Sequence, residues 1–303
     1  MTSSRTATLG AHTVNRMGYG AMQLAGPGVF GPPSDPQAAR AVLRRAIELG
    51  VDHVDTSQYY GPDVVNELIR EALAPYPPGL RIVSKVGGRR DGAGGWLPAQ
   101  HRDELRAGVE ENLATLGVES LAVVNLRLMD PGPRGAAPAI ALAEQLGTMQ
   151  DLRNEGKIEG IGLSSAPRAI VEEALELVEL ACVQNAFSIV HRDAQDVLEL
   201  CAARDIAFVP FFPLGSAFTG GPAAIASDPH VIDVAAKHGA STSQVALAWL
   251  LHRGPHVLLI PGTSSIAHLE ENVAAATIDL DDDDMQALEQ VRQSGDPMQA
   301  THD

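Results

Sequence analysis

Leu121–Arg127 reads LAVVNLR, a run that is apolar at almost every position. A strand with one solvated face alternates apolar and polar residues, whereas a continuous apolar run is typical of a strand covered on both faces, as in a parallel sheet. The stretches AFVPFF at 207–212 and HVLLI at 256–260 have the same character. Short runs of this kind recur along the chain and predict eight strands, at residues 16–22, 51–56, 81–85, 121–127, 158–163, 181–186, 206–212 and 256–260.

Amphipathic segments between these strands predict helices. Ser34-Asp35-Pro36 begins the first and Gly50 ends it, in line with the residues preferred at helix starts and stops. Further helices are predicted at residues 103–116, 139–154, 168–177, 194–204, 231–237 and 243–251. Eight strand–helix units in 303 residues favour a closed (β/α)8 TIM barrel over a doubly wound open sheet. We therefore expect residues 1–303 to form a single α/β domain.

Shorter stretches add detail to this barrel. TLGAHTV at residues 8–14 has Gly10 at its turn and predicts an N-terminal hairpin that plugs the bottom of the barrel. The stretches 91–98 and 130–138 are rich in Gly and Pro and follow predicted strands, so we expect substrate loops on the C-terminal rim. The acidic run Asp281–Asp284 is best interpreted as a helix N-terminus, where carboxylates face the positive end of the helix dipole, with a metal site as the alternative.

Composition limits the classes of partner. The formal net charge of −16 would repel a phosphate backbone, so nucleic-acid binding is not expected. No apolar run approaches the ~18 residues of a membrane span, and the N-terminus has no signal-like apolar region, so we expect a cytoplasmic protein without a membrane partner. Cys182 and Cys201 lie in apolar surroundings and are interpreted as buried thiols, with a disulfide or a reactive thiol as the alternative.

Ionisable residues gather at the ends of consecutive predicted strands. Asp55 ends the second strand, Tyr60 follows five residues later, and Lys85 and Arg127 end the third and fourth. A buried charge is costly unless it is paired, so Asp55 and Lys85 are natural partners. The alternative is an ion pair with a purely structural role at the barrel mouth.

Such a cluster suits carbonyl reduction. A free phenol has a pKa near ~10, and a neighbouring ammonium group lowers it. Lys85, held by Asp55, would therefore lower the pKa of Tyr60, and Tyr60 would protonate the carbonyl oxygen as hydride reaches the carbon. No metal-ligand spacing is present, and we interpret His53 as a packing residue rather than a ligand.

Seven spaced segments carry a resemblance to a known family. GYGAMQLAG, VDHVDTSQYYG, VSKVG, IGLSS, VQNAF, FFPLG and IPGTSS…HLEEN occur in the order found in the aldo–keto reductase superfamily, and the match covers nearly the whole chain. The N-terminal stretch VNRMGYGAMQLAGPGVFGPP and the strand VVNLR resemble the bacterial pyridoxal reductase branch. This resemblance implies reduction of pyridoxal to pyridoxine with NADPH.

The resemblance also implies catalytic roles. The superfamily's catalytic Asp, Tyr and Lys match Asp55, Tyr60 and Lys85. Its catalytic His falls on Arg127, or on Asn125 if the alignment slips by two residues, and strand periodicity does not separate these two. A guanidinium at this place could orient and polarise a carbonyl oxygen but could not transfer a proton.

The cofactor site is implied in the same way. No GxGxxG segment follows a strand, so a Rossmann site is not supported. PGTSS instead follows the eighth strand and precedes a helical stretch, where barrels bind phosphate. The residues implied are Gly20, Ala21 and Met22 along the cofactor, Ser164 and Gln184 at the carboxamide, Phe211 on the nicotinamide ring, Leu214, Gly215 and Ser216 at the pyrophosphate, Gly262, Thr263, Ser264 and His268 at the 2′-phosphate, and Asn272 at the adenine.

Two departures weaken this cofactor assignment. The superfamily often has a basic residue where His268 stands, so NADH use remains open beside NADPH. It usually has Asn where this chain has Ser165, which removes one carboxamide contact.

The substrate pocket is less defined. Gln58, Tyr59, Trp96 and Arg127 are candidates at the rim, and an aromatic lining would suit a planar phenolic aldehyde. A broad-specificity aldehyde or ketone reductase, or a tailoring reductase for a secondary metabolite, are the other enzymes considered. A redox-sensing regulatory subunit that binds NADP(H) is the alternative from another class. The sequence leaves the oligomeric state open.

Overall fold

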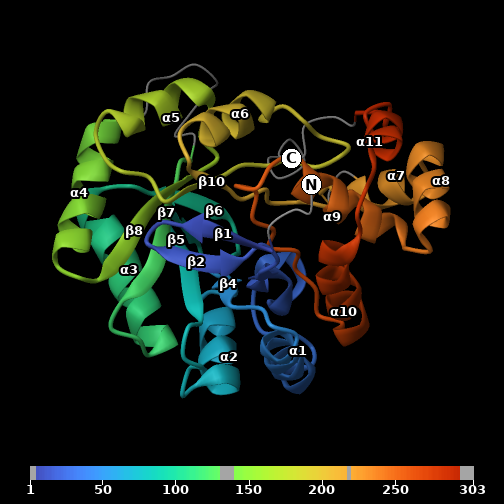
Figure 1. The fold of residues 1–303 in the computed structure, drawn as a ribbon. Helices are drawn as coiled ribbons and strands as arrows, with labels where there is room; N and C mark the ends of the chain where they lie inside the picture. Colours follow the sequence, from blue (N-terminus) through green and yellow to red (C-terminus); the bar gives the residue numbers. More distant parts are fainter. Residues whose placement is uncertain (1–4, 130–139, 217–219, 294–303) are drawn as a thin grey trace.

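The computed structural model describes residues 5–129, 140–216 and 220–293, and these form a barrel of parallel strands inside a ring of helices (Figure 1). The strands of the barrel follow the order β10-β9-β8-β7-β5-β4-β3. The strands are β1 (Thr6–Leu9), β2 (His12–Asn15), β3 (Tyr19–Gly20), β4 (His53–Asp55), β5 (Arg81–Arg90), β6 (Trp96–Ala99), β7 (Leu121–Arg127), β8 (Ile158–Ser164), β9 (Cys182–Gln184) and β10 (Ala207–Phe208).

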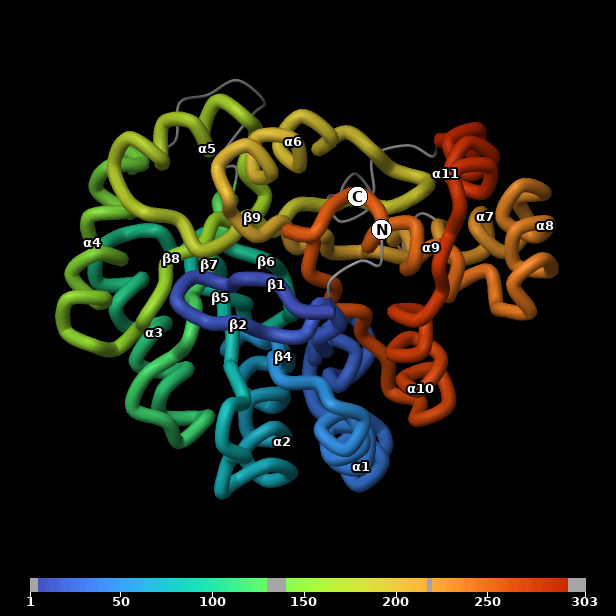
Figure 2. The backbone as a smooth tube through the Cα atoms, in the orientation of Figure 1, coloured from blue at the N-terminus to red at the C-terminus, as the bar shows by residue number. Residues whose placement is uncertain are grey.

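The predicted eighth strand closes the barrel. Residues 257–259 form isolated parallel bridges to both neighbours, Val257 with Phe208 of β10 and Leu259 with Met17 just before β3. The amide of Gly18 donates to the carbonyl oxygen of Leu259 at 2.7 Å, and the amide of Leu258 donates to that of Phe208 at 3.0 Å. Figure 2 shows this orange stretch beside the blue start of the chain. The predicted TIM barrel is therefore confirmed.

The helices also follow the prediction, with two additions. They are α1 (Pro36–Glu48), α2 (Val64–Leu73), α3 (Arg102–Leu116), α4 (Leu142–Asn154), α5 (Arg168–Leu175), α6 (Gln195–Ala203), α7 (Gly221–Ser227), α8 (Pro229–His238), α9 (Thr242–His252), α10 (Ile266–Ala274) and α11 (Asp282–Leu288). The sequence analysis missed α2 and α7. In α2, Val65, Leu68 and Ile69 are buried at helical spacing against the sheet, which is the usual signal of an amphipathic helix. Short 3-10 helices are η1 (Ala21–Leu24), η2 (Pro27–Val29) and η4 (Ala275–Thr277).

The N-terminal hairpin plugs the barrel as predicted. β1 and β2 pair antiparallel around Gly10, and Figure 1 shows them lying across one end of the strands. Leu9 and Val14 join the apolar cluster inside the barrel, which contains Val83, Val123, Ala181, Cys182, Ala207, Val209, Leu258 and Ile260. Apolar side chains therefore fill this end of the barrel. The polar residues of the barrel lie at the opposite end, where β4, β5, β7, β8 and β9 finish.

The prediction for 91–98 is partly wrong. β5 does not end at Lys85 but continues to Arg90, and it pairs antiparallel with β6, so a second hairpin rises above the barrel. Asp91 holds its turn by accepting hydrogen bonds from the amides of Ala93 (2.9 Å) and Gly95 (2.7 Å). The other predicted loop, 130–138, lies outside the described residues.

The acidic run begins α11, as predicted. Asp281 accepts a hydrogen bond from the amide of Asp284 and caps the helix. The carboxylate of Asp284 accepts hydrogen bonds from Lys237 and His238, both at 2.7 Å, so its oxygens are occupied by side chains of α8. Within the described part of the chain, no group of three or more His, Cys, Asp or Glu residues is arranged to hold a metal ion, and no helix has the length and apolar character that crossing a membrane requires.

Candidate active site

A buried ion pair joins the ends of β4 and β5. The ammonium group of Lys85 donates to the carboxylate of Asp55 and, at 3.1 Å, to the carbonyl oxygen of Thr56. Gln184 at the end of β9 donates from Nε2 to the other carboxylate oxygen of Asp55 at 2.7 Å. Asp55 and Lys85 are each only 3% exposed, so these bonds offset the cost of burying two charges. The predicted pairing is thus present in the structure.

Tyr60 lies beside this pair. The Lys85 ammonium is 5.2 Å from the centre of the Tyr60 ring, and the ring is buried. The tight turn after β4 holds the residue, since its amide donates to the carbonyl oxygen of Ser57 at 3.1 Å. Gly61 follows with a φ of +100°, a conformation that favours glycine, and a Cβ there would lie 2.6 Å from that of Val64.

The electrostatics of Tyr60 differ from the expectation. Burial raises the pKa of Tyr60, the charge of Asp55 raises it further, and the charge of Arg127 lowers it. The predicted lowering of this pKa by Lys85 is therefore wrong, because Asp55 compensates the ammonium charge while the phenol is desolvated. A phenol with a raised pKa stays protonated at neutral pH and can donate its proton.

Arg127 and Asn125 lie two residues apart on β7, so they share one face of the strand. Asn125 pairs in register with Lys85 of β5. Its side-chain amide donates to the carbonyl oxygen of Ser84 (3.4 Å) and accepts from the Cys182 thiol (3.2 Å). The guanidinium of Arg127 lies 6.0 Å from the centre of the Phe211 ring. Its Nε is buried and has no hydrogen-bond partner among the residues that the structure describes.

An aromatic wall continues outward from Tyr60. The Tyr59 ring meets the Tyr60 ring edge-on at 5.4 Å between centroids, and the Trp96 ring at 5.2 Å. The guanidinium of Arg90 stacks 4.1 Å above the Trp96 ring. Two of the predicted substrate residues, Tyr59 and Trp96, are therefore brought together, and Arg90 is a third member that the sequence analysis missed because the β5–β6 hairpin was not predicted.

Gln58 does not join this wall. Its side-chain oxygen accepts from Asn112 of α3 at 2.8 Å and from Ser57 at 3.1 Å, and it is buried. The side chain of Gln58 thus belongs to a polar network between the turn and α3, and its contact with the substrate stays a prediction.

The ends of β8 and β9 carry polar atoms without partners. Ser164 and Gln184 are paired in the sheet register, and Ser164 Oγ and Gln184 Oε1 are both buried without a hydrogen-bond partner within the described ranges. Buried polar atoms are normally satisfied, so such a pair fits a ligand that brings both a donor and an acceptor, as a carboxamide does. Ser165 follows with a φ of +60°, and its buried Oγ is likewise without a partner there.

Asn185 is a positioning residue that the sequence analysis missed. Its side chain accepts from the amide of Ala166 (3.0 Å) and donates to the Ala166 carbonyl oxygen (2.7 Å). These two bonds fix the turn that follows Ser164 and Ser165. Its place in VQNAF, directly after Gln184, was the available signal.

The first and last strands approach each other closely at the predicted phosphate end. A Cβ on Gly20 would lie 2.4 Å from the carbonyl oxygen of Ile260, and one on Gly262 would lie 2.6 Å from that of Gly20. The two glycines are thus required by this contact. Ala21 is buried behind them and Met22 is half-buried.

The segment after Gly262 opens α10. Ser265, which the sequence analysis did not assign, caps the helix by accepting from the amide of His268 at 3.4 Å, and its own amide donates to the Thr263 hydroxyl at 3.0 Å. Ser264 and His268 are exposed, while Asn272 is buried one turn further along. The exposed first turn of α10 therefore presents amides and a histidine to solvent.

The loop after β10 contains the remaining predicted cofactor residues. Phe211 is half-buried and meets Phe212 edge-on at 5.2 Å. Gly215 has a φ of +74°, and a Cβ there would lie 2.6 Å from Cα of Gly221. Leu214 is half-buried and Ser216 is buried; the chain is not described at 217–219.

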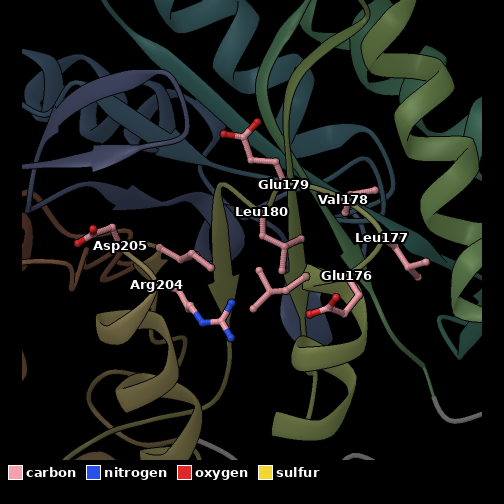
Figure 3. A pocket seen from close by; sticks show the side chains of 9 residues that line it. Glu176, Leu177, Val178, Glu179, Leu180, Arg204 and Asp205 are labelled. Carbon is pink, nitrogen blue, oxygen red and sulfur yellow. The ribbon is translucent and has the colours of Figure 1, made fainter.

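An open groove lies at the opposite end of the barrel. It runs between the segments that precede β9 and β10, and it is lined by residues 175–180 and 204–206 (Figure 3). Glu176, Glu179, Arg204 and Asp205 give it a mixed charge. None of the predicted site residues lies there.

Comparisons with known proteins agree with this geometry. Residues 16–293 match the sequence profile of the Aldo/keto reductase family. The chain is 49% identical over 287 residues to pyridoxine 4-dehydrogenase of Escherichia coli (strain K12), covering 95% of this chain and 98% of that protein. It is 38% identical over 292 residues to an uncharacterized oxidoreductase of Schizosaccharomyces pombe, covering 96% and 91%.

Solved structures share the fold. A thermostable aldo-keto reductase crystallised with the inhibitor epalrestat superposes with a TM-score of 0.78 at 28% identity, covering 94% of this chain and 99% of that one. The glycerol dehydrogenase of Gluconobacter oxydans has a TM-score of 0.81 at 19% identity, with 96% and 95% covered, which is a likeness of fold alone.

Proposed function

Because the chain belongs to the aldo/keto reductase family, we propose that this oxidoreductase uses NADPH to reduce pyridoxal to pyridoxine. The observation that carries the reaction type is the buried cluster of Asp55, Lys85 and Tyr60 at the open end of the barrel. Support for the substrate comes from the relative named pyridoxine 4-dehydrogenase, which aligns along nearly the whole of both chains. The name of that relative describes the oxidation of pyridoxine, and the reaction proposed here is the same conversion in the direction of reduction.

In this proposal Tyr60 is the proton donor. When bound, NADPH supplies the hydride for the carbonyl carbon. The raised pKa of Tyr60 keeps its hydroxyl protonated until the carbonyl oxygen gains charge and takes the proton. The Asp55–Lys85 ion pair packs against Tyr60 and holds it in place. Arg127 stabilises the negative charge that develops on the carbonyl oxygen.

Ser164 and Gln184 are proposed to hold the nicotinamide carboxamide with their free buried atoms, and Phe211 to stack on its ring. The pyrophosphate would lie along Leu214, Gly215 and Ser216, with Gly20, Ala21 and Met22 opposite. The 2′-phosphate would meet the first turn of α10 at Gly262, Thr263, Ser264 and His268, and the adenine would meet Asn272. Tyr59 and Trp96 would form one wall of the substrate pocket.

The proposal is tested by following the absorbance of NADPH with pyridoxal and a panel of simple aldehydes and ketones, with NADH in parallel. We expect pyridoxal to give the highest kcat/KM and Tyr60→Phe to remove turnover. A higher kcat/KM for several unrelated aldehydes would identify a broad-specificity reductase instead. Tight NADPH binding without turnover of any substrate would contradict the enzymatic role and favour a redox-sensing subunit.

A further inference from the structure

Among the described residues, the charges around Tyr60 do not balance. Asp55 compensates Lys85, but Arg127 has no ion pair with a described residue, and its buried Nε has no hydrogen-bond partner among them. It lies half-buried at the end of β7, against the face of Phe211. A desolvated cation without a counter-charge favours a ligand that brings a negative charge to it.

A second polar atom nearby also has no partner. Tyr59 is 2% exposed, and its hydroxyl group makes no hydrogen bond within the described parts of the chain. The two residues meet the same stretch of β5: a Cβ on Gly88 would lie 3.7 Å from Cε1 of Tyr59, and one on Gly87 would lie 2.4 Å from the carbonyl oxygen of Arg127. Arg127 is also the charged group that most lowers the pKa of Tyr59, against the effect of burial. Arg127 thus offers a cationic donor and Tyr59 a neutral donor near Tyr60, whose ring Tyr59 meets edge-on at 5.4 Å.

We propose that Arg127 and the Tyr59 hydroxyl bind an ionised hydroxyl group on the ring carbon next to the aldehyde, so that the enzyme selects ortho-hydroxyaryl aldehydes. The inference rests on the proposed function and deepens it, since pyridoxal carries such a hydroxyl group. Tyr60 protonates the carbonyl oxygen, and the planar set of donors on Arg127 allows it to contact both the carbonyl oxygen and the neighbouring ring oxygen. The rings of Tyr59 and Trp96 favour a planar aromatic substrate over an aliphatic one.

The pairing also assists the chemistry. A phenolate in the ortho position donates electrons to the carbonyl and makes it a poorer acceptor of hydride. Neutralising that phenolate with a guanidinium opposes the effect, so the cation contributes to binding and to the rate alike.

The test compares substrates that differ only at the ortho oxygen. 5-Nitrosalicylaldehyde is ionised at neutral pH because its nitro group acidifies the phenol, whereas 2-methoxy-5-nitrobenzaldehyde carries no charge. We expect wild-type KM to be about tenfold lower for the phenolate, and the kcat/KM ratio of the two substrates to fall roughly 10-fold or more in Arg127→Met. The ratio for Arg127→Lys should lie between those of the wild type and Arg127→Met. Tyr59→Phe should lower the ratio less than Arg127→Met does.

Arg89→Met is the matched control, because Arg89 is an exposed cation on β5, the strand that pairs with β7. It should leave the ratio unchanged. Melting temperature and NADPH affinity, measured by quenching of protein fluorescence, confirm that each variant is folded. If Arg127→Met does not fold, the comparison of wild-type KM values and the Tyr59→Phe variant still test whether the ortho oxygen is bound as proposed.

Three outcomes overturn the inference: a wild-type preference for the methyl ether, a ratio that Arg127→Met leaves unchanged, or a stronger preference for 2-carboxybenzaldehyde, which would indicate a carboxylate site. Failure of the proposed function is a different result. In that case wild-type protein with NADPH reduces neither pyridoxal nor 3-nitrobenzaldehyde, the uncharged parent compound.

Discussion

The ammonium group of Lys85 lies 5.2 Å from the centre of the Tyr60 ring while its hydrogen bonds go to Asp55 and to the backbone. Because Lys85 and Asp55 are bonded to each other, we propose the Tyr60 hydroxyl as the group that exchanges a proton with the substrate. The ion pair holds the position of the Tyr60 ring. Gln184, which also binds Asp55, extends this support to the strand that carries the proposed carboxamide contact. In the proposed mechanism, the carboxylate of Asp55 therefore links the positions of substrate and cofactor.

Tyr60→Phe should abolish turnover because it removes the proton donor without removing ring packing. We expect kcat to fall by roughly 10²–10⁴-fold, the usual contribution of a positioned acid. The dissociation constant for NADPH, measured by fluorescence quenching, should stay within about twofold, since no proposed cofactor contact is lost. Near-normal reduction rates in this variant would contradict the proposed role of Tyr60 as proton donor.

The pH profile should reflect the raised pKa of Tyr60. An acid is competent below its pKa, so reduction should not lose activity as pH rises toward the ordinary phenol value of ~10. Asp55→Asn removes a charge that raises this pKa and frees the charge of Lys85, so the alkaline loss of kcat/KM should move to lower pH. Profiles of both proteins from about pH 6 to about pH 10 test this, and an unmoved alkaline limb in Asp55→Asn would contradict it.

The barrel and the main cluster could be predicted because strong local patterns specify them. Continuous apolar runs mark strands buried on both faces, and parallel strands bring their C-terminal residues to one end, which is enough to join Asp55 and Lys85. Capping residues such as Gly50 and Gly117 mark helix ends.

The β5–β6 hairpin could not be predicted in this way. Trp96–Ala99 contains a proline and follows a turn rich in glycine, so its local signal is that of a loop. Pairing with β5 and the stacking of Arg90 on Trp96 make it a strand, and both are contacts beyond the reach of periodicity. The hydrogen bond between Gln58 and Asn112 could not be predicted for a related reason, since the closeness of Gln58 to Tyr60 in sequence does not reveal which way its side chain faces.

Ser165→Asn should improve both stability and cofactor binding. The residue has a φ of +60°, which Asn tolerates better than Ser, and an Asn side chain could supply the missing carboxamide contact. We expect a gain of about 0.5 kcal/mol in unfolding free energy and a few-fold lower dissociation constant for NADPH. Ser165→Gly is the control, because it relaxes the backbone alone. If the glycine variant tightens binding as much as the asparagine variant, the contact is not the cause.

His268→Arg should increase the preference for NADPH over NADH. His268 lies exposed in the first turn of α10, next to the proposed 2′-phosphate position, and a neutral histidine attracts phosphate weakly. A permanent guanidinium should raise the NADPH:NADH ratio of kcat/KM roughly 10-fold. The gain should shrink as salt concentration rises, because the site is exposed. An unchanged ratio would place the phosphate elsewhere.

Arg90→Met should loosen the aromatic wall. Arg90 stacks on Trp96 and donates hydrogen bonds to the carbonyl oxygens of Gly94 (2.6 and 3.0 Å), Val29 (3.1 Å) and Gly28 (3.0 Å), so it ties the hairpin to the segment 28–31. That segment pairs in turn with Gly61, the residue after Tyr60. Loss of these bonds should lower the unfolding free energy by about 2 kcal/mol and raise KM for aromatic aldehydes several-fold more than it lowers kcat.

The chemistry of the guanidinium makes the Arg90 prediction specific. A lysine cannot donate to three carbonyl groups and stack on a ring at once, so Arg90→Lys should recover less than half of the lost stability. Arg89→Met, at the exposed neighbouring position, should change neither KM nor melting temperature measurably. Equal effects of the Arg89 and Arg90 variants would mean that net charge at the barrel mouth, rather than the tie between the hairpin and Gly61, determines how the wall holds its substrate.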